Sequence, residues 1–351
     1  MNRRDFIRGG SVMLGSLFLG GLEGKVFSQT KSSSRIEEFK AKLINDAVLK
    51  KAGVTEDEIR GYFSDSRYNE HTNIEYYFKY NIEGKADSAG AKETNPIKKK
   101  ELEEKAYQEY KARLKIEDKK ILAVDFYRQY EEHLARAEEI YGVDRRYIIA
   151  TIGIETDFGM NTGKQFKAFN ALASIYGFVK IPRISLYEEA LPDGSKVIKT
   201  RKEDWGESFA LPHAKELILY AHRQNKLNGK NINDILYYPS SYAACIGNGQ
   251  FTPESLKLYS VGKDGSYNAD PFDMVDSIYS VANYFNKRMG WKKEYNRLNY
   301  LGEKNKSMRD AIAKVLRRYN ASKNYGRALM EIANDSQWPD SYIKAFSYMQ
   351  K

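Results

Sequence analysis

The chain has 351 residues, so one large domain or two modest ones are expected. Hydrophobic residues make up 42% of it and aromatic residues 13%, which is enough for a sizeable core and excludes a disordered chain. The formal net charge is +10, but the lysines at 98–100 lie beside glutamates at 101, 103 and 104. We interpret the basic excess as a solvated surface and expect no nucleic-acid binding, although an anionic polymer stays open as a partner.

The first 28 residues have the layout of a cleavable export signal. Arg3, Arg4 and Arg8 form a charged start, a glycine-bearing apolar stretch follows, and small residues offer a cleavage site. The apolar stretch is shorter than a membrane-spanning helix requires, so no transmembrane anchor is expected in the mature chain. Phe6 and Ile7, two and three positions after the arginine pair, favour the twin-arginine motif, which a bacterial receptor reads. An ordinary secretion signal is the alternative.

Spacing and composition then predict a mainly α-helical chain. The predicted helices, in chain order, lie within residues 36–63, 98–114, 121–141, 145–158, 213–224, 273–289 and 308–333, with a further one that begins at Pro253 after the cap Thr252. Asp144 is the expected N-cap of the helix at 145–158, and Gly159 its stop. Turn-forming residues interrupt the helical pattern at 186–205 and predict a surface hairpin inserted between helices.

Metal, nucleotide and thiol chemistry find little support in the sequence. The four histidines are scattered without the H-E-x-x-H spacing of zinc enzymes, and no phosphate-binding glycine loop is present. Cys245 is the only cysteine, so the chain has no intrachain disulfide and no thiolate metal cluster. We therefore expect no metal and no cofactor, and we interpret Cys245 as a buried small residue.

One glutamate stands out on the predicted helix at 145–158. Ile148, Ile152 and Glu155 recur at helical spacing and share one face. A carboxylate among isoleucines is costly to keep ionised, which favours the protonated form that a general acid requires near neutral pH. The alternative is a structural glutamate at the helix end, exposed or paired with an arginine.

Two other segments could contact a ligand. In the glycine-rich stretch at 240–251, glycines allow close backbone approach, and Ser241 and Gln250 can bond to hydroxyls or amides. The alternative is a helix–loop–helix corner whose glycines serve only the turn. The stretch at 318–325 brings two of the 27 tyrosines, residues that often stack on polar rings, although most of the 27 are expected to pack in the core.

Several ordered motifs together carry a resemblance that spans about residues 110–333. These motifs are Phe126-Tyr127-Arg128-Gln129-Tyr130, Ile154-Glu155-Thr156-Asp157-Phe158-Gly159, Gly249-Gln250-Phe251, Ser280-Val281-Ala282-Asn283-Tyr284-Phe285, Gly290-Trp291 and Arg318-Tyr319-Asn320. Together they resemble lytic murein transglycosylases of the B type. The resemblance implies a lysozyme-like helical fold and non-hydrolytic cleavage of peptidoglycan between N-acetylmuramic acid and N-acetylglucosamine, which leaves 1,6-anhydromuramyl ends.

The resemblance also implies roles for single residues. Glu155 falls on the catalytic position, where it acts first as an acid and then as a base without a cofactor, while the N-acetyl group of the substrate replaces a second carboxylate. Ser241 falls on the cleft serine and Gln250 on the substrate-binding glutamine. The remaining substrate-binding positions implied are Tyr110, Arg183, Tyr187, Tyr284, Tyr319, Asn320 and Tyr325.

Four segments follow along the chain. They are a cleavable twin-arginine export signal at 1–28, an N-terminal helical and irregular extension at 29–105, a transglycosylase catalytic domain at 106–340 with an insertion near 186–206, and a C-terminal tail at 341–351. The expected location is the periplasm of a Gram-negative bacterium. The expected partners are peptidoglycan glycan strands, with weak association with cell-wall machinery. A hydrolytic muramidase and an inactive peptidoglycan-binding scaffold remain as alternatives.

The family can carry a calcium loop, and its counterpart here is the stretch at 262–276. The ligand positions read Gly262, Asp264, Ser266, Asn268 and Asp276, so the leading acidic residue is missing. Calcium prefers six to eight oxygen ligands, several of them carboxylates. The sequence therefore predicts weak calcium binding or none.

Overall fold

The structure is a computed structural model that describes residues 32–79, 89–190, 196–292, 294–296, 306–334 and 338. The predicted export signal and the C-terminal tail lie outside the described residues. The helices are α2 Ser32–Ile44, α3 Ala47–Lys51, α4 Glu56–Ser64, α5 Ile74–Lys79, α7 Pro96–Arg113, α8 Ile116–Tyr141, α9 Arg145–Thr156, α10 Ala168–Phe178, α11 Trp205–Asn228, α12 Ile232–Leu236, α13 Pro253–Tyr259, α14 Met274–Tyr284, the π-helical turn η1 Phe285–Met289, α16 Lys306–Leu316 and α17 Lys323–Ala333. The strands are β1 Phe166–Lys167, β2 Pro182–Ala190, β3 Lys196–Asp204 and β4 Pro239–Ser240. The predicted mainly α-helical class is confirmed.

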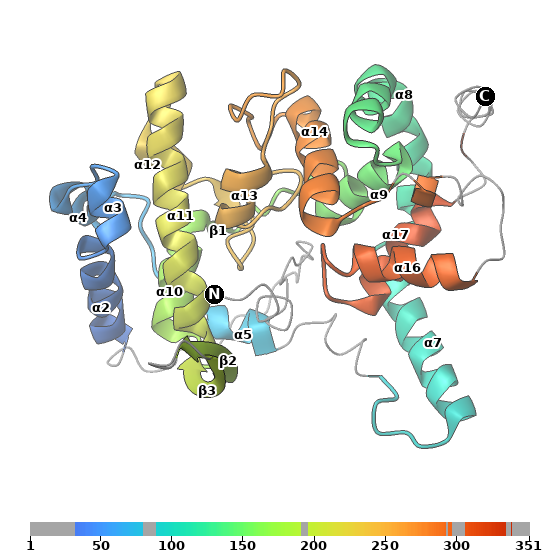
Figure 1. Cartoon of the computed structure of the whole chain (residues 1–351), viewed down its shortest axis with the longest axis horizontal. Coiled ribbons are helices and arrows are strands. Elements are labelled where there is room, and N and C mark those ends of the chain that lie inside the picture. The colour runs from blue at the N-terminus through green and yellow to red at the C-terminus, as the bar shows by residue number, and fades with distance from the viewer. Residues whose placement is uncertain are drawn as a thin grey trace.

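The helices spread along the long axis of the molecule (Figure 1). Helices α2, α3 and α4 lie at one end beside α10 and α11, and α7, α8, α16 and α17 lie at the other. Helix α9 packs against α8, α14 and α17, and one hydrophobic cluster runs through the described residues. The helix that carries Glu155 is therefore enclosed by neighbours on several sides.

Helix α9 begins where the sequence predicts and ends earlier. The Asp144 side chain accepts a hydrogen bond from the amide of Arg146 at 2.9 Å, which confirms the predicted cap. The helix ends at Thr156, because the next two residues, Asp157 and Phe158, have left-handed φ angles of 50° and 58°. The Phe158 ring folds back onto Gly153, where an added Cβ would lie 2.6 Å from it. The left-handed turn at these two residues ends the helix two residues before the predicted position.

The predicted hairpin is present between α10 and α11. Strands β2 and β3 pair in antiparallel register from Pro182 opposite Asp204 to Ala190 opposite Lys196, so the hairpin begins slightly before the predicted insertion. Asp204 then caps α11, accepting from the amide of Gly206 at 2.9 Å. Helix α11 thus starts at Trp205, earlier than the sequence predicts, and carries Pro212 within it.

Local caps explain most of the other helix boundaries. The segment at 36–63 contains three helices, because Asp46 caps α3 and Thr55 forms a capping box with Glu58 at the start of α4. The predicted cap Thr252 is confirmed on α13, and Asp273 caps α14. Helix α14 ends at Tyr284, short of the predicted helix end, and continues as η1 up to Gly290. The predicted domain boundary at 105/106 falls within α7, and that division stays a prediction.

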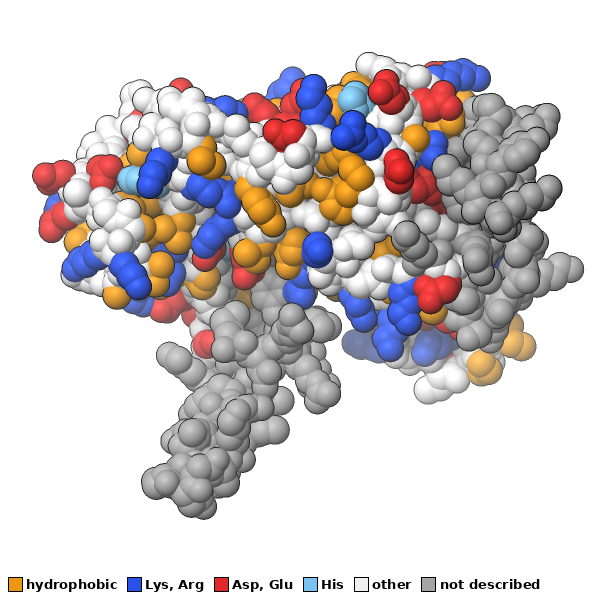
Figure 2. Space-filling model, turned by 45° about the horizontal axis from the view of Figure 1, so that its top comes forward, with side chains coloured by type: hydrophobic (Ala, Val, Ile, Leu, Met, Phe, Trp, Pro, Cys, Tyr) orange, Lys and Arg blue, Asp and Glu red, His pale blue; other side chains and the backbone are white. Residues whose placement is uncertain are grey.

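The surface carries charges of both signs. On the face drawn in Figure 2, lysines and arginines are interspersed with aspartates and glutamates over the described part of the chain. Among the described residues, no helix is both long and apolar enough to cross a membrane.

Candidate functional site

Glu155 lies in the last turn of α9, but it is not exposed. Only 1% of its surface is accessible to solvent. The Tyr325 hydroxyl, from the first turn of α17, donates a hydrogen bond of 2.6 Å to Oε1 of Glu155. The alternative of an exposed glutamate at the helix end is therefore wrong, and α9 and α17 together define the position of this carboxylate.

A group of buried tyrosines surrounds this hydrogen bond. The Tyr325 ring is nearly parallel to that of Tyr319, with centroids 6.2 Å apart, and Tyr284 meets Tyr319 edge-on at 5.0 Å. The Tyr319 hydroxyl donates to the carbonyl oxygen of Gly249 at 2.6 Å. Burial, together with the nearby Glu155 charge, holds the pKa of Tyr319 and of Tyr325 well above its usual value. Both hydroxyls therefore stay protonated and serve as hydrogen-bond donors.

The glycine-rich loop is tightly folded beside these tyrosines. Ile246 and Phe251 form a small bridge through hydrogen bonds of 2.9 and 3.1 Å, which closes the loop on itself. Gly247 has φ 75°, and a Cβ there would lie 2.3 Å from the Pro271 carbonyl oxygen, so only glycine fits. Gln250 adopts φ 47°, a conformation that non-glycine residues rarely adopt. Such strain is common at functional sites.

Gln250 also has an unsatisfied oxygen. Its side chain is fully buried, and Nε2 donates to the carbonyl oxygen of Gly247 at 2.8 Å. Oε1 is also buried, and none of the described residues donates a hydrogen bond to it. A buried acceptor without a donor costs free energy, so this oxygen is suited to receive a donor from a ligand.

Ser241 and Cys245 link the loop to Glu155. The Ser241 Oγ accepts a hydrogen bond from the amide of Cys245 at 3.1 Å. Burial raises the pKa of the Cys245 thiol to about 12; the Ser241 hydroxyl opposes the shift and the Glu155 charge adds to it. A thiol held protonated is a poor nucleophile, which agrees with the interpretation of Cys245 as a buried packing residue.

Three further predicted residues lie in the same region. Tyr110 on α7 is buried within electrostatic reach of Tyr325. Tyr284 on α14 stacks on Phe251 at 5.4 Å, and burial raises its pKa to about 12. Asn320 is buried, and its Oδ1 accepts from the amide of Ser322 at 3.0 Å, just before α17 begins. The structure therefore gathers eight of the ten predicted site residues around α9, α14, α17 and the loop.

The other two predicted residues lie on the hairpin. Arg183 and Tyr187 are in β2, opposite Glu203 and Lys199 of β3, and β3 packs on α11. In Figure 1 the hairpin lies beside α10 and apart from α17. The backbone of β2 therefore does not bring Arg183 and Tyr187 to Glu155, and their side chains lie outside what the structure describes.

A buried ion pair that we did not predict lies next to the site. Lys119 on α8 is buried and pairs with Asp157, which follows the last residue of α9. Burial lowers the pKa of Lys119 to about 8. Helical spacing could have indicated that Lys119 is buried, because it lies on the same face of α8 as the buried residues Ile116, Ala123 and Phe126. This pair helps to hold the left-handed turn that ends α9.

The loop at 262–276 does not offer a complete ligand set for calcium. A Cβ added to Gly262 would lie 3.0 Å from Oδ1 of Asp264 and 3.3 Å from Oδ1 of Asp276, so the missing side chain belongs between these carboxylates. Among the described residues, no group of three or more His, Cys, Asp or Glu side chains converges as a metal site would require. Weak calcium binding or none remains the prediction.

Comparison with known proteins agrees with this geometry. Residues 36–312 match the family described as the transglycosylase SLT domain. The membrane-bound lytic murein transglycosylase B of Escherichia coli (strain K12) is 32% identical over 170 residues, which are 48% of this chain and 38% of that protein. The chain thus spans about two fifths of the length of this curated relative.

Solved structures show the same fold at low identity. The E. coli lytic transglycosylase SLT35, in complex with bulgecin A, has a TM-score of 0.55 at 19% identity, over 90% of this chain and 94% of that one. SltB3 from Pseudomonas aeruginosa, in complex with NAG-NAM-pentapeptide, has a TM-score of 0.55 at 14% identity, over 87% and 79%. These similarities confirm the predicted lysozyme-like fold.

Proposed function

Since this chain belongs to the transglycosylase SLT domain family, we propose that it is a lytic transglycosylase of peptidoglycan. Its substrate is the β-1,4 bond between N-acetylmuramic acid and N-acetylglucosamine, and its product carries a 1,6-anhydromuramyl end. The observation that carries the proposal is the buried Glu155 held by Tyr325, beside a strained loop that bears Ser241 and Gln250. The complex of SltB3 with NAG-NAM-pentapeptide supports the ligand class.

Glu155 supplies both proton transfers. In its protonated form, Glu155 gives a proton to the glycosidic oxygen as the bond to C1 breaks. The N-acetyl oxygen of the muramyl sugar stabilises the positive charge that develops at C1, as in substrate-assisted glycosidases. The ionised Glu155 then takes the proton of the C6 hydroxyl, whose oxygen attacks C1. No water is consumed, and Glu155 returns to its starting form.

Neighbouring side chains orient the reacting groups. The Tyr325 hydroxyl fixes the orientation of the Glu155 carboxylate through its 2.6 Å hydrogen bond. Because Ser241 Oγ accepts from the loop backbone, its own hydroxyl hydrogen can point to the N-acetyl oxygen. Gln250 accepts a donor from the glycan with its unsatisfied Oε1.

The cellular setting is part of the same proposal. The signal at 1–28 directs the chain to the twin-arginine route, and the mature protein acts on glycan strands in the periplasm. The catalytic domain covers residues 106–340, and Arg183 and Tyr187 contact the substrate from the hairpin. Weak association with cell-wall machinery brings the enzyme to its substrate.

Replacing Glu155 with glutamine tests the function. Glu155→Gln keeps the shape of the side chain but holds no transferable proton, so turnover should fall toward the high end of the ~100- to 10,000-fold range for general acid–base catalysis. The assay digests purified sacculi and identifies the released muropeptides by mass spectrometry. Wild type should release anhydro ends, whose mass is one water lower than that of hydrolysed ends.

The half-buried glutamate of α13 provides the matched control. Glu254→Gln makes the same chemical change in the first turn of α13, outside the proposed catalytic residues, and should keep wild-type turnover. Retention of more than about a tenth of the activity by Glu155→Gln would contradict the assignment, since that loss is below the range for acid–base catalysis. Reducing ends in the wild-type digest would indicate a muramidase, and glycan binding without any release would indicate a scaffold.

A further inference from the structure

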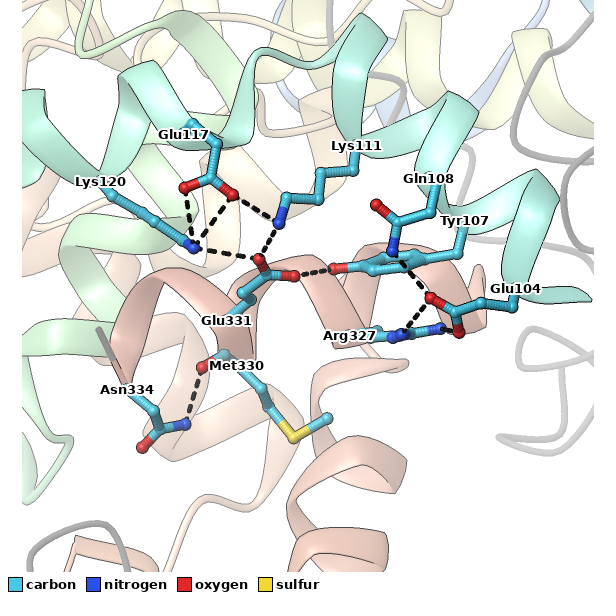
Figure 3. Close-up of polar contacts among 10 residues, drawn as sticks. All are labelled: Glu104, Tyr107, Gln108, Lys111, Glu117, Lys120, Arg327, Met330, Glu331 and Asn334. Carbon is cyan, nitrogen blue, oxygen red and sulfur yellow. Dashed lines mark hydrogen bonds and ion pairs between the residues drawn. The ribbon is translucent and has the colours of Figure 1, made fainter. Parts of the chain in front are cut away.

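Helix α17, which carries Tyr325, is fixed to α7 and α8 by polar contacts on its outer side. Its inner side buries Tyr325, Leu329 and Ile332. Its outer side presents Lys323, Arg327 and Glu331, which recur every four residues and so form one stripe. Figure 3 shows Arg327 and Glu331 of this stripe pointing at side chains of α7 and α8.

Glu331 is the centre of these contacts. Its Oε2 accepts from the Tyr107 hydroxyl at 2.5 Å, and its Oε1 accepts from Lys120 at 3.0 Å and from Lys111. We call Glu331, Tyr107, Lys111 and Lys120 the α17 clamp. Burial alone would raise the pKa of Glu331, but hydrogen bonds from the three partners outweigh it and lower the pKa to about 2. The carboxylate is therefore ionised at neutral pH and binds both lysines as a charged group.

The clamp differs from ordinary surface ion pairs. Exposed pairs contribute little, because water screens them and the side chains lose freedom. Here Glu331 is 26% exposed, Lys111 19% and Lys120 12%, and Tyr107 is fully buried. Arg327 adds a second contact to the same tyrosine, stacking 3.6 Å above the Tyr107 ring while it pairs with Glu104. Hydrogen bonds to a charged group in such a site are strong and geometrically specific.

The clamp is connected to Glu155 through one rigid helix. Tyr325 and Glu331 lie about 9 Å apart along the axis of α17, at ~1.5 Å per residue. A small shift of this helix therefore moves the Tyr325 hydroxyl, and a 2.6 Å hydrogen bond weakens when its length or angle changes. Helix α7 contacts both the clamp and the surroundings of Tyr325, because Tyr107 donates to Glu331 and Tyr110 lies near Tyr325.

We propose that Glu331 is a positioning residue, which holds α17 through the clamp so that Tyr325 presents its hydroxyl to Glu155. This role rests on the proposed transglycosylase function. Glu331 itself touches no reacting atom and acts only through Tyr325. The clamp contributes to turnover rather than to glycan binding.

A double-mutant cycle tests this role. Turnover and KM are measured on a soluble peptidoglycan oligomer for wild type, Glu331→Gln, Tyr325→Phe and the double variant, below the unfolding temperature of each. We expect Glu331→Gln to lower kcat about three- to tenfold with KM unchanged, because it weakens an interaction that serves the transition state. The double variant should be no slower than Tyr325→Phe, since the clamp has nothing left to position.

Glu117→Gln is the matched control. Glu117 pairs with the same two lysines, but among the described residues it forms no ion pair or hydrogen bond with α17, so this variant should keep wild-type kcat. If Glu331→Gln folds poorly, Tyr107→Phe removes only the hydroxyl that Glu331 accepts and should give the same kinetic pattern. The proposal would be overturned if the kcat losses of the two single variants multiplied in the double variant, or if Glu331→Gln left kcat unchanged. The proposed function is tested separately, by Glu155→Gln and by the anhydro product.

Discussion

Gln250 combines two unfavourable features in one residue. Its left-handed backbone costs a non-glycine residue ~1–2 kcal/mol, and its buried Oε1 lacks a donor. Glu155 is similar, because burying a carboxylate is costly unless it is hydrogen-bonded. A donor from the substrate would satisfy the Gln250 oxygen, which accepts no hydrogen bond from the described residues. Such residues are better explained by function than by stability.

The unsatisfied oxygen of Gln250 leads to a kinetic prediction. Gln250→Ala removes the acceptor for a glycan donor, and one hydrogen bond is worth ~0.5–1.5 kcal/mol net. We therefore expect KM to rise about three- to tenfold while kcat changes less, because the lost contact serves substrate and transition state alike. Initial rates on a soluble peptidoglycan oligomer measure both constants.

Gln224 on α11 offers a control of the same residue type. It is also buried, but its Nε2 bonds to the Tyr267 carbonyl oxygen, away from the loop. Gln224→Ala should leave KM unchanged even if the protein becomes less stable. Equal KM values in the two variants would show that Gln250 does not bind the glycan.

At the level of elements, the loop at 262–276 has carboxylates at two of the expected calcium-ligand positions and a glycine at the leading one. The amides of Lys263 and Asp270 donate to the Asp276 carboxylate, and the amide of Ser266 donates to Asp264. The loop thus keeps its carboxylates close together around Gly262. Gly262→Asp places a third carboxylate among them, which repels the other two unless a cation is bound.

We expect Gly262→Asp to acquire calcium-dependent stability. In a chelator its Tm should fall below that of wild type, and millimolar calcium should raise it, since ligand at about 100 times Kd adds ~2.7 kcal/mol. Wild type should show a much smaller calcium response or none. Gly262→Asn, which adds an oxygen without a charge, should respond less. A calcium-dependent Tm in the wild type would show that the loop binds the ion despite Gly262.

Element boundaries were predictable where local chemistry sets them. Asp144, Thr252 and Asp273 act as caps because their side chains bond to amides two or three residues ahead, which the sequence displays directly. The end of α9 was not predicted, because Asp157 and Phe158 adopt left-handed φ angles that non-glycine residues rarely adopt. The predicted helix at 213–224 was too short at its start, because Asp204 caps α11 where the hairpin ends.

At the scale of the whole molecule, some features of the site were predictable from local sequence and others depend on how distant helices pack. Helical spacing and the family motifs predicted Glu155 as a site residue. Its contact with Tyr325, however, joins residues 170 positions apart. The clamp contact of Tyr107 with Glu331 spans 224 positions. No periodicity within one segment predicts such pairs, because they depend on how α7, α9 and α17 pack together. The sequence therefore predicts the reacting residues better than it predicts the residues that hold them in place.

The last prediction concerns the whole chain and its route out of the cytoplasm. The twin-arginine signal is read by a receptor that recognises the arginine pair itself, so a conservative change of both residues should block it. We expect Arg3→Lys with Arg4→Lys to leave the unprocessed protein in the cytoplasm, while wild type appears in the periplasm as a shorter chain that begins near Gln29. Fractionation and N-terminal sequencing measure both outcomes. Arg8→Lys provides the control, because it keeps the pair and changes the same residue type nearby. Undiminished export of the double variant would instead indicate the ordinary secretion route, since that pathway requires only a positively charged start before the apolar stretch.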